Sequence, residues 1–283
     1  MTNIVVTGAA GQLGTAMRTG IGAATFLTHD QLDLGEPDGM RAVLDELAPE
    51  ILINCAAYTA VDRAQEQELM ATRINGSAVA EMAEYCQANG ARFVTFSTDY
   101  VFDGVSDVPW LESDLTNPIN AYGRSKLVGE TSTLAARGLV IRTSWLVSGT
   151  HPNFIATMLR LGQERDLRVV DDQSGCPTMA DDLVAATLQA IDAGATGVLH
   201  CANEGPTTWF EFARAALSCA GLDPGRVLPC ATAEFPTPAP RPAYSVLGSE
   251  RRHSLGIDDL PSWMDSLPRV VEQLFANGVV AAL

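Results

Sequence analysis

A tyrosine and a lysine four residues apart form the first pair in this chain that could carry out acid–base chemistry. Tyr122 and Lys126 make up the pattern Y-x-x-x-K within NAYGRSKLVGE. On a helix this spacing places both side chains on one face. A nearby ammonium favours the phenolate, so we expect Lys126 to lower the pKa of Tyr122 from about 10. Such pairs are common on amphipathic helices, so this one becomes significant only beside a cofactor site.

Two hydroxyl side chains follow the fourth apolar run, in the segment FSTDY. Ligands of open α/β sheets gather at the carboxyl ends of the strands. We therefore expect Thr98 to hydrogen-bond the carbonyl group of a substrate, with Ser97 as the alternative. Both hydroxyls could instead cap the end of the strand.

A glycine-rich turn follows the first apolar run, residues 4–7, in the segment TGAAGQLG. Gly8 permits a tight turn, Gly11 allows a pyrophosphate to approach the backbone, and Gly14 lets a helix pack close to the strand. Gln12 and Leu13 begin that helix, whose free N–H groups attract an anion. A strand, this turn and a helix in succession predict a dinucleotide-binding cradle.

The second strand, near residues 24–28, should end at the residue that contacts the adenosine ribose. Asp30 could accept the ribose 2′-hydroxyl, as in NAD-selective sites, whereas Thr28 would tolerate a 2′-phosphate. No arginine stands here to bind that phosphate, so NADH and NADPH both remain possible. Asp33 and Leu34 could flank the adenine, although Asp33 could equally be a polar turn residue.

Short apolar runs alternate with amphipathic stretches through the first half of the chain. Strands are expected at 4–7, 24–28, 51–55, 92–97 and 139–143, and helices from 12, at 37–47, within 69–88 and at 121–136. This alternation predicts an α/β fold with a Rossmann-type, doubly wound parallel sheet.

The alternation breaks down after residue 148. Helices are expected at 154–163, 179–192 and 208–220, and short strands at 168–170 and 198–201. We therefore expect a dinucleotide-binding domain at 1–148 and a smaller mixed α/β substrate-binding part at 149–283, between which the chain can cross. The segment 235–244, FPTPAPRPAY, cannot be helical because proline lacks a backbone donor. It is either a linker or a loop that covers a ligand.

Composition excludes several classes of protein. The net charge of −16 over 283 residues argues against a nucleic-acid surface, which needs a basic patch. No apolar run reaches the roughly 18 residues of a membrane span, and the N-terminus lacks the basic region of a secretory signal, so we expect a cytoplasmic protein. The six cysteines and four histidines are scattered without metal-ligand spacing, which predicts free thiols and no metal.

Together these motifs resemble the extended short-chain dehydrogenase/reductases and, within them, the dTDP-4-dehydrorhamnose reductases. The similar segments follow one another in order from residue 4 to about residue 245. They are TGAAGQLG, NCAAYTAVDRAQ, STDYVFDG, NAYGRSKLVGE, RTSWLVSG, NFIATMLRL, DDQSGCPT and FPTPAPRP. STDYVFDG, RTSW and DQSGCPT are far more specific than the glycine and tyrosine patterns.

The resemblance implies a role for each matching position. Thr98, Tyr122 and Lys126 would be catalytic, and Arg241 in the proline-rich segment would bind a nucleotide diphosphate. Residues after the third strand would line the cofactor, namely Ala56, Ala57 and Tyr58. The remaining matches would contact the sugar, namely Asp99, Tyr100 and Trp145.

The implied reaction is reduction, by NADPH or NADH, of the 4-keto group of a dTDP-linked 6-deoxyhexulose to give dTDP-L-rhamnose. A related 4-ketosugar reductase or synthase of an antibiotic-sugar pathway is the alternative, and a non-catalytic regulatory subunit is a more distant one. Some members of the family dimerise through a metal held by glutamates. Here residues 14–17 contain no acid and Asp181 replaces a glutamate, so we expect a monomer or weak homodimer without a metal bridge.

Overall fold

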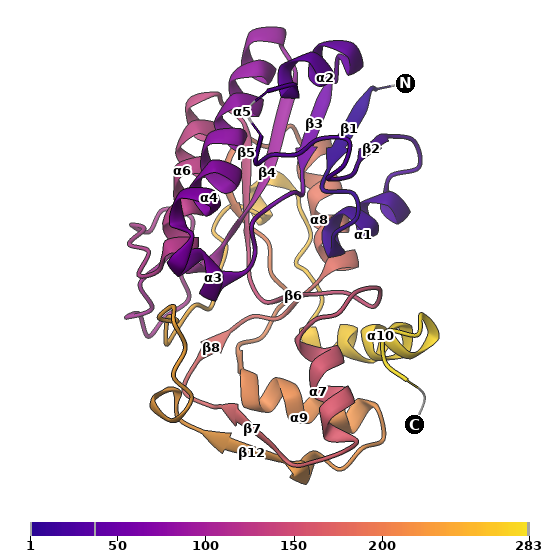
Figure 1. Cartoon of the computed structure of the whole chain (residues 1–283), viewed down its shortest axis with the longest axis vertical. Helices are drawn as coiled ribbons and strands as arrows, with labels where there is room; N and C mark the ends of the chain where they lie inside the picture. The colour runs from indigo at the N-terminus through magenta and orange to yellow at the C-terminus, as the bar shows by residue number, and fades with distance from the viewer. Residues whose placement is uncertain (1, 37, 282–283) are drawn as a thin grey trace.

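A parallel sheet of six strands lies at the centre of the upper half of the molecule, in the order β10-β5-β4-β3-β1-β2 (Figure 1). The computed structural model describes residues 2–36 and 38–281. The direction of the strand order reverses between β1 and β3, which is where doubly wound sheets bind ligands. The strands are β1 (Ile4–Thr7), β2 (Thr25–Leu27), β3 (Ile51–Asn54), β4 (Arg92–Thr98), β5 (Leu139–Thr143) and β10 (Gly197–His200).

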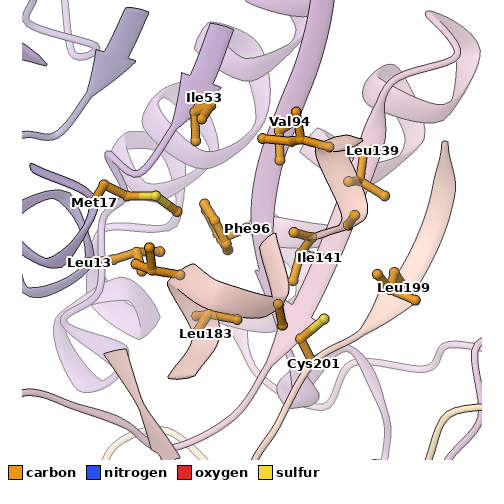
Figure 2. Packing of buried hydrophobic residues seen from close by; sticks show 14 of the residues in the cluster. Leu13, Met17, Ile53, Val94, Phe96, Leu139, Ile141, Leu183, Leu199 and Cys201 are labelled. Carbon is orange, nitrogen blue, oxygen red and sulfur yellow. The ribbon is translucent and has the colours of Figure 1, made fainter. Parts of the chain in front are cut away.

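Both faces of the sheet are buried, which explains why its strands are almost continuously apolar. Val6 and Ile53 pack in the core formed with α1 (Gln12–Gly20) and α8 (Ala180–Asp192). Their neighbours Val5 and Leu52 point the other way, into the core formed with α2 (Met40–Leu47) and α5 (Ala78–Asn89). Figure 2 shows the first core, in which Leu13 and Met17 of α1 and Leu183 of α8 pack with side chains of the strands. The strand side chains include Phe96 and Ile141.

The second face also carries the helix that precedes β5. This helix is α6 (Ala121–Ala135), which packs on α5. The stretch predicted as one long or two short helices is a run of three: α4 (Glu68–Thr72), a π-helical turn (Arg73–Ser77) and α5. A short helix, α3 (Val61–Glu66), was not predicted. The predicted start of α2 at Pro37 lies outside the described residues.

The lower half of the molecule in Figure 1 has its own core, around α7 (Phe154–Gly162), α9 (Trp209–Cys219) and α10 (Trp263–Ala276). A parallel pair, β7 (Leu167–Val170) and β12 (Val227–Cys230), covers one side of it. The shorter pairs are β6 (Leu146–Val147) with β9 (Thr178–Met179), and β8 (Ser174–Gly175) with β11 (Thr207–Thr208). Four 3-10 turns complete the described elements, at Asp99–Val101, Pro224–Arg226, Thr232–Glu234 and His253–Leu255.

The chain crosses between the two halves more than once. After building α7 and β7 it returns to the sheet, where α8 packs on α1 and β10 pairs with β5. A boundary at residue 148 therefore does not separate the sheet from the rest, and residues 180–200 belong with the first half. All six cysteines are free thiols. No helix in the described ranges is both long and apolar enough to cross a bilayer.

Candidate active site

A cavity of about 770 Å³ lies at the carboxyl ends of the central strands. The glycine turn forms one part of its wall, and side chains of β4 and α6 form another. Of the residues predicted for the site, the following line it: Gly8, Gly11, Gln12, Leu13, Asp33, Leu34, Ala56, Ala57, Tyr58, Thr98, Asp99, Tyr122, Lys126 and Trp145. Ser97, the alternative hydroxyl, also lines it.

The glycine turn has the geometry that a bound pyrophosphate requires. Gly8 has a φ of +68°, and a Cβ atom there would lie 2.5 Å from the backbone nitrogen of Ala56. A Cβ atom on Gly14 would lie 2.2 Å from the carbonyl oxygen of Gly8, so Gly14 supports the turn from outside the cavity. Gly11 is the N-cap of α1 and provides no side-chain cap. The first N–H groups of α1 are thus available to an anion.

Two buried asparagines hold the loop after β3 against the cavity. Asn54 accepts hydrogen bonds from the Thr7 hydroxyl at 2.6 Å and from the backbone N–H of Ala56 at 3.1 Å. Asn75, in the π-helical turn, accepts from the N–H of Tyr58 at 2.8 Å and donates to the carbonyl oxygen of Tyr58 at 3.0 Å. These contacts set the position of the cavity wall.

At the end of β2 the structure favours a different residue from the one predicted. Asp30 is exposed and is not part of the cavity lining, whereas His29 is. A tight turn explains why His29 lines the cavity and Asp30 does not. In this turn Gln31 and Leu32 both donate backbone hydrogen bonds to the carbonyl oxygen of Thr28, at 3.1 and 3.0 Å. Asp33 lines the cavity and lies 3.5 Å from the His29 ring.

The catalytic candidates come from two neighbouring elements. β4 ends at Thr98, and α6 begins at Asn120, whose side chain caps the helix by accepting from the N–H of Gly123 at 2.8 Å. This start places Tyr122 in the first turn of α6 and Lys126 one turn later. The hydroxyls of Tyr122 and Thr98 are within hydrogen-bonding reach of each other. The three predicted side chains are therefore brought together in the wall of the cavity.

The expected lowering of the Tyr122 pKa is wrong. Burial, and to a smaller extent the charge of Asp99, raise the pKa of Tyr122 above its ordinary value, and the hydrogen bond with Thr98 opposes them only in part. The four-residue spacing does place Lys126 on the same face of α6 as Tyr122, but desolvation of the phenolate has the larger effect on the Tyr122 pKa. Tyr122 is therefore held in its protonated form, which is the form that can donate a proton.

Lys126 is itself perturbed by burial. Its side chain is 5% exposed, and desolvation lowers its pKa to about 8, against the opposing charges of Glu130 and Cys55. The ammonium of Lys126 is thus lost within the range of pH in which enzymes are assayed.

Asp99 and Tyr100, which follow Thr98 directly, lie behind the catalytic side chains. The carboxylate of Asp99 is 2% exposed, and burial raises its pKa to about 7, while hydrogen bonds from Ser245 and Thr98 oppose the shift. The Tyr100 ring meets the Tyr122 ring edge to face, with 6.2 Å between their centroids. Tyr100 does not line the cavity itself.

Trp145 forms part of the cavity wall in a strained conformation. Its φ is +46°, which is uncommon for a residue other than glycine. Its indole stacks on Trp209 with 3.6 Å between centroids and lies against Gly175, where a Cβ atom would come within 2.5 Å of it. Strain that the surrounding packing maintains is common at ligand sites.

Arg241 lies outside the cavity lining but next to it. Its guanidinium forms an ion pair with Asp62 of α3 and interacts with the Tyr100 hydroxyl. The loop that carries it is held to α6 through Asn120, whose side chain donates to the carbonyl oxygen of Pro240 at 2.9 Å. The proline-rich segment is therefore fixed to α3 and to the start of α6 and is not a free linker.

Other residues of the cavity were not predicted. Thr143 ends β5 and Ser144 follows it. The rule that ligands gather at strand ends would have found both. His151 approaches the glycine turn from the lower half, with 2.9 Å between its ring Nε2 and the carbonyl oxygen of Ala10. No sequence pattern pointed to it.

A parallel doubly wound sheet, a glycine turn at its switch point and a tyrosine–lysine pair in the wall of the same cavity define a Rossmann-type oxidoreductase. The chain belongs to the RmlD substrate binding domain family, whose model matches residues 1–276.

Characterised relatives cover nearly the whole chain. A dTDP-4-dehydrorhamnose reductase from Burkholderia thailandensis is 38% identical over 97% of this chain and 99% of its own length. A dTDP-4-keto-6-deoxy-D-glucose reductase from Streptomyces niveus is 38% identical over 96% of this chain and 98% of its own. The crystal structure of a dTDP-4-dehydrorhamnose reductase from Bacillus anthracis in complex with NADP superimposes with a TM-score of 0.92, at 36% identity, over 96% of this chain and 100% of that one.

Proposed function

We propose that this chain reduces the 4-keto group of a dTDP-linked 6-deoxyhexulose with NADPH or NADH, giving dTDP-L-rhamnose. One observation carries the proposal: Thr98, Tyr122 and Lys126 line the same cavity as the glycine turn. A dinucleotide bound along such a cavity places its nicotinamide beside the tyrosine. The relatives named dTDP-4-dehydrorhamnose reductase supply the substrate class.

When bound, the reduced nicotinamide supplies a hydride to carbon 4 of the sugar. Thr98, once its hydroxyl has turned away from Asp99, donates a hydrogen bond to the carbonyl oxygen and so fixes its orientation. Tyr122 transfers its phenolic proton to the same oxygen as it acquires negative charge, which completes the alcohol. Because an alkoxide is far more basic than a phenolate, this transfer is favourable even with the raised pKa of Tyr122. Lys126 binds the nicotinamide ribose and stabilises the tyrosinate that remains.

We assign the cofactor and the sugar nucleotide to different sets of residues. We assign the cofactor to residues 1–148 together with α8 and β10, through the glycine turn, Asp33, Leu34 and residues 56–58. We assign the sugar nucleotide to Asp99, Tyr100 and Trp145, together with the proline-rich loop that carries Arg241. Asp30 contributes to ribose binding only if its turn rearranges, and His29 is better placed.

Several finer assignments belong to the same proposal. We propose that the chain is an extended short-chain dehydrogenase/reductase, because it combines the glycine turn with the tyrosine–lysine pair. Free thiols throughout the chain fit a reducing compartment such as the cytoplasm. We propose a monomer or weak homodimer without a metal bridge, since Asp181 lies 3.9 Å from Arg269 within its own chain.

A second candidate is a 4-ketosugar reductase of an antibiotic-sugar pathway. Two Streptomyces relatives support it: the dTDP-4-keto-6-deoxy-D-glucose reductase, and a probable dTDP-4,6-dihydroxy-2-methyloxan-3-one 4-ketoreductase that is 40% identical over 96% of this chain. A non-catalytic regulatory role is disfavoured because Thr98, Tyr122 and Lys126 are all present and brought together.

The test is turnover of dTDP-4-keto-6-deoxy-L-lyxo-hexulose with NADPH and with NADH, followed by loss of reduced-nicotinamide absorbance. Tyr122→Phe is the matched variant, because it removes only the phenolic oxygen; we expect its rate to fall by about 10²- to 10⁴-fold while cofactor affinity is retained. Oxidation of cofactor with dTDP-4-keto-6-deoxy-D-glucose alone would favour the second candidate. No oxidation with either sugar, or full turnover by Tyr122→Phe, would refute the proposal.

A further inference from the structure

The guanidinium of Arg241 is fixed at one of its corners. Nη1 donates to the Asp62 carboxylate and to the carbonyl oxygen of Ala239, the latter at 2.6 Å. The same carboxylate oxygen of Asp62 accepts from the backbone N–H of Ala239 at 3.2 Å. Asp62 therefore binds both the side chain and the backbone of the proline-rich loop, and these contacts reinforce one another.

Asp62 is suited to act as a permanent anion. The hydrogen bond from Arg241 lowers the pKa of Asp62 below its ordinary value, although burial opposes the shift. Its side chain is 41% exposed, whereas that of Arg241 is only 17% exposed. Solvent thus screens the negative charge of Asp62 from a ligand, while the guanidinium that it holds is largely removed from water.

The contacts with Asp62 and Ala239 leave the other edge of the guanidinium for further acceptors. Both of them use Nη1, and an arginine carries additional N–H groups on Nε and Nη2 in a rigid plane. The Tyr100 hydroxyl, which also interacts with Arg241, lies on the side of the catalytic Tyr122. Arg241 is therefore one residue, Tyr100, away from the catalytic Tyr122, with Nε and Nη2 not used by Asp62 or Ala239.

The loop is positioned from a second direction as well. Asn120, the cap of α6, donates to the carbonyl oxygen of Pro240. Gly104 allows Pro242 to approach so closely that a Cβ atom on the glycine would lie 2.5 Å from the Pro242 Cβ atom. Arg241 is thus held between α3, through Asp62, and the helix that carries Tyr122.

We infer that Asp62 is a positioning residue for the sugar nucleotide: it holds Arg241 by one corner so that the opposite edge binds the diphosphate. The inference rests on the proposed function for the identity of the ligand, a nucleoside diphosphate. A free arginine side chain would have to give up its rotational freedom on binding, and Asp62 removes that cost in advance. The alternative is that Asp62 occupies the anion site and competes with the diphosphate. In that case, removing the Asp62 charge would increase the affinity for the diphosphate.

The experiment measures binding of dTDP by calorimetry and turnover of the ketosugar in parallel. For Asp62→Asn we expect affinity for dTDP to fall about tenfold and KM for the sugar nucleotide to rise by a similar factor. The kcat should stay within about twofold, and affinity for NADPH should be unchanged, because Asp62 contacts neither the reacting atoms nor the glycine turn. Asp62→Glu should recover part of the affinity, since it restores the charge.

Two comparisons show whether the effect passes through Arg241. Glu66→Gln removes an exposed carboxylate from the same helix and should leave dTDP affinity unchanged. In an Arg241→Ala background, Asp62→Asn should have no further effect on dTDP binding. An equal loss in that background would overturn the inference, as would unchanged or tighter binding by Asp62→Asn alone.

The outcomes separate this inference from the proposed function. Suppose that the wild-type chain binds dTDP and that Asp62→Asn binds it more weakly, but that the wild-type chain reduces no ketosugar. The proposed function then fails and the inference stands. If the wild-type chain turns over the ketosugar while Asp62→Asn behaves as wild type, only the inference fails. A wild-type chain that does not bind dTDP at all would overturn both.

Discussion

Thr98 donates a hydrogen bond of 2.9 Å to Asp99, its own neighbour in the chain, and so joins a catalytic hydroxyl to a buried carboxylate. The backbone N–H of Tyr100 in turn donates to the Thr98 oxygen at 3.2 Å. The other carboxylate oxygen of Asp99, Oδ2, is buried without a hydrogen-bond partner among the described residues. The end of β4 thus places the Asp99 carboxyl, which is buried and only partly hydrogen-bonded, directly beside the catalytic Thr98.

This arrangement predicts a loss of stability as pH rises. Burial raises the pKa of Asp99 to about 7, whereas the unfolded chain ionises near its ordinary value of about 4. Between these values unfolding releases a proton, so the stability of the folded state falls with pH by at most about 1.4 kcal/mol per unit. Asp99→Asn removes this dependence. The free energy of unfolding of the variant should therefore rise, relative to that of the wild type, as the pH goes from about 4 to about 7.

Urea unfolding between about pH 4.5 and about 7.5 measures this difference. Asp107→Asn, which removes an exposed carboxyl from a nearby loop, is the matched control. Stability curves for Asp99→Asn and wild type that stay parallel over the window would contradict the prediction.

A second pH effect should arise from Lys126. Burial lowers its pKa to about 8, so its ammonium is present below that value and lost above it. We expect kcat/KM of the wild type to fall as pH rises through about 8, because the charge that supports the tyrosine and the ribose disappears. Lys126→Arg retains a charge throughout and should be slower but flat over the same range. A fall at the same pH in the arginine variant would assign the titration to another group.

Gly8→Ala should damage both the fold and the cofactor site. The residue has a φ of +68°, and the added Cβ atom would meet the backbone of Ala56 at 2.5 Å. We expect stability to fall by about 1–3 kcal/mol and NADPH affinity to fall at least about tenfold. Gly22→Ala, on an exposed turn with open space around the new atom, should change stability by less than about 0.5 kcal/mol. Equal behaviour of the two variants in thermal unfolding and cofactor titration would contradict the assignment.

Gly175→Ala should disturb the sugar side of the cavity alone. The new Cβ atom would lie 2.5 Å from Cε2 of Trp145, so the indole must move off Trp209. The coupled circular dichroism of the two stacked indoles should weaken, and KM for the sugar nucleotide should rise about three- to tenfold, since small misplacements at a site have large effects. Cofactor affinity should be unchanged. An intact dichroism signal together with a normal KM would contradict the role of Trp145.

The sheet was largely predictable because its strands are buried on both faces and therefore appear as separate apolar runs. α10 and β12 were missed as well, although α10 has buried apolar residues at helical spacing. Several of the other missed elements lack any such periodic signal. In α3 one residue, Ala64, is buried among six, and β6, β8, β9 and β11 have two residues each. The π-helical turn that carries Asn75 continues the helical pattern on both sides, so nothing in the sequence marks it.

Site residues were predictable where they lie at strand ends or within local motifs. Thr98 ends β4 and Asp99 follows it directly, and Tyr122 and Lys126 share one helix. The pairing of Asp62 with Arg241 joins positions 179 residues apart, and His151 meets Ala10 across 141 residues, so only the path of the chain brings them together. The pKa of Tyr122 depends on burial, which spacing does not reveal.

The return of the chain to the sheet has a consequence for synthesis on the ribosome. β5 pairs with β4 on one side and with β10 on the other. Until residues 144–196 have been translated, which takes roughly 3–11 s at ordinary rates, the second side of β5 has no partner. A nascent chain halted in that interval presents an apolar strand with open N–H and C=O groups, the surface on which chains aggregate. Co-translational folding is therefore most vulnerable while the lower half is being made, and that interval is where chaperones should associate.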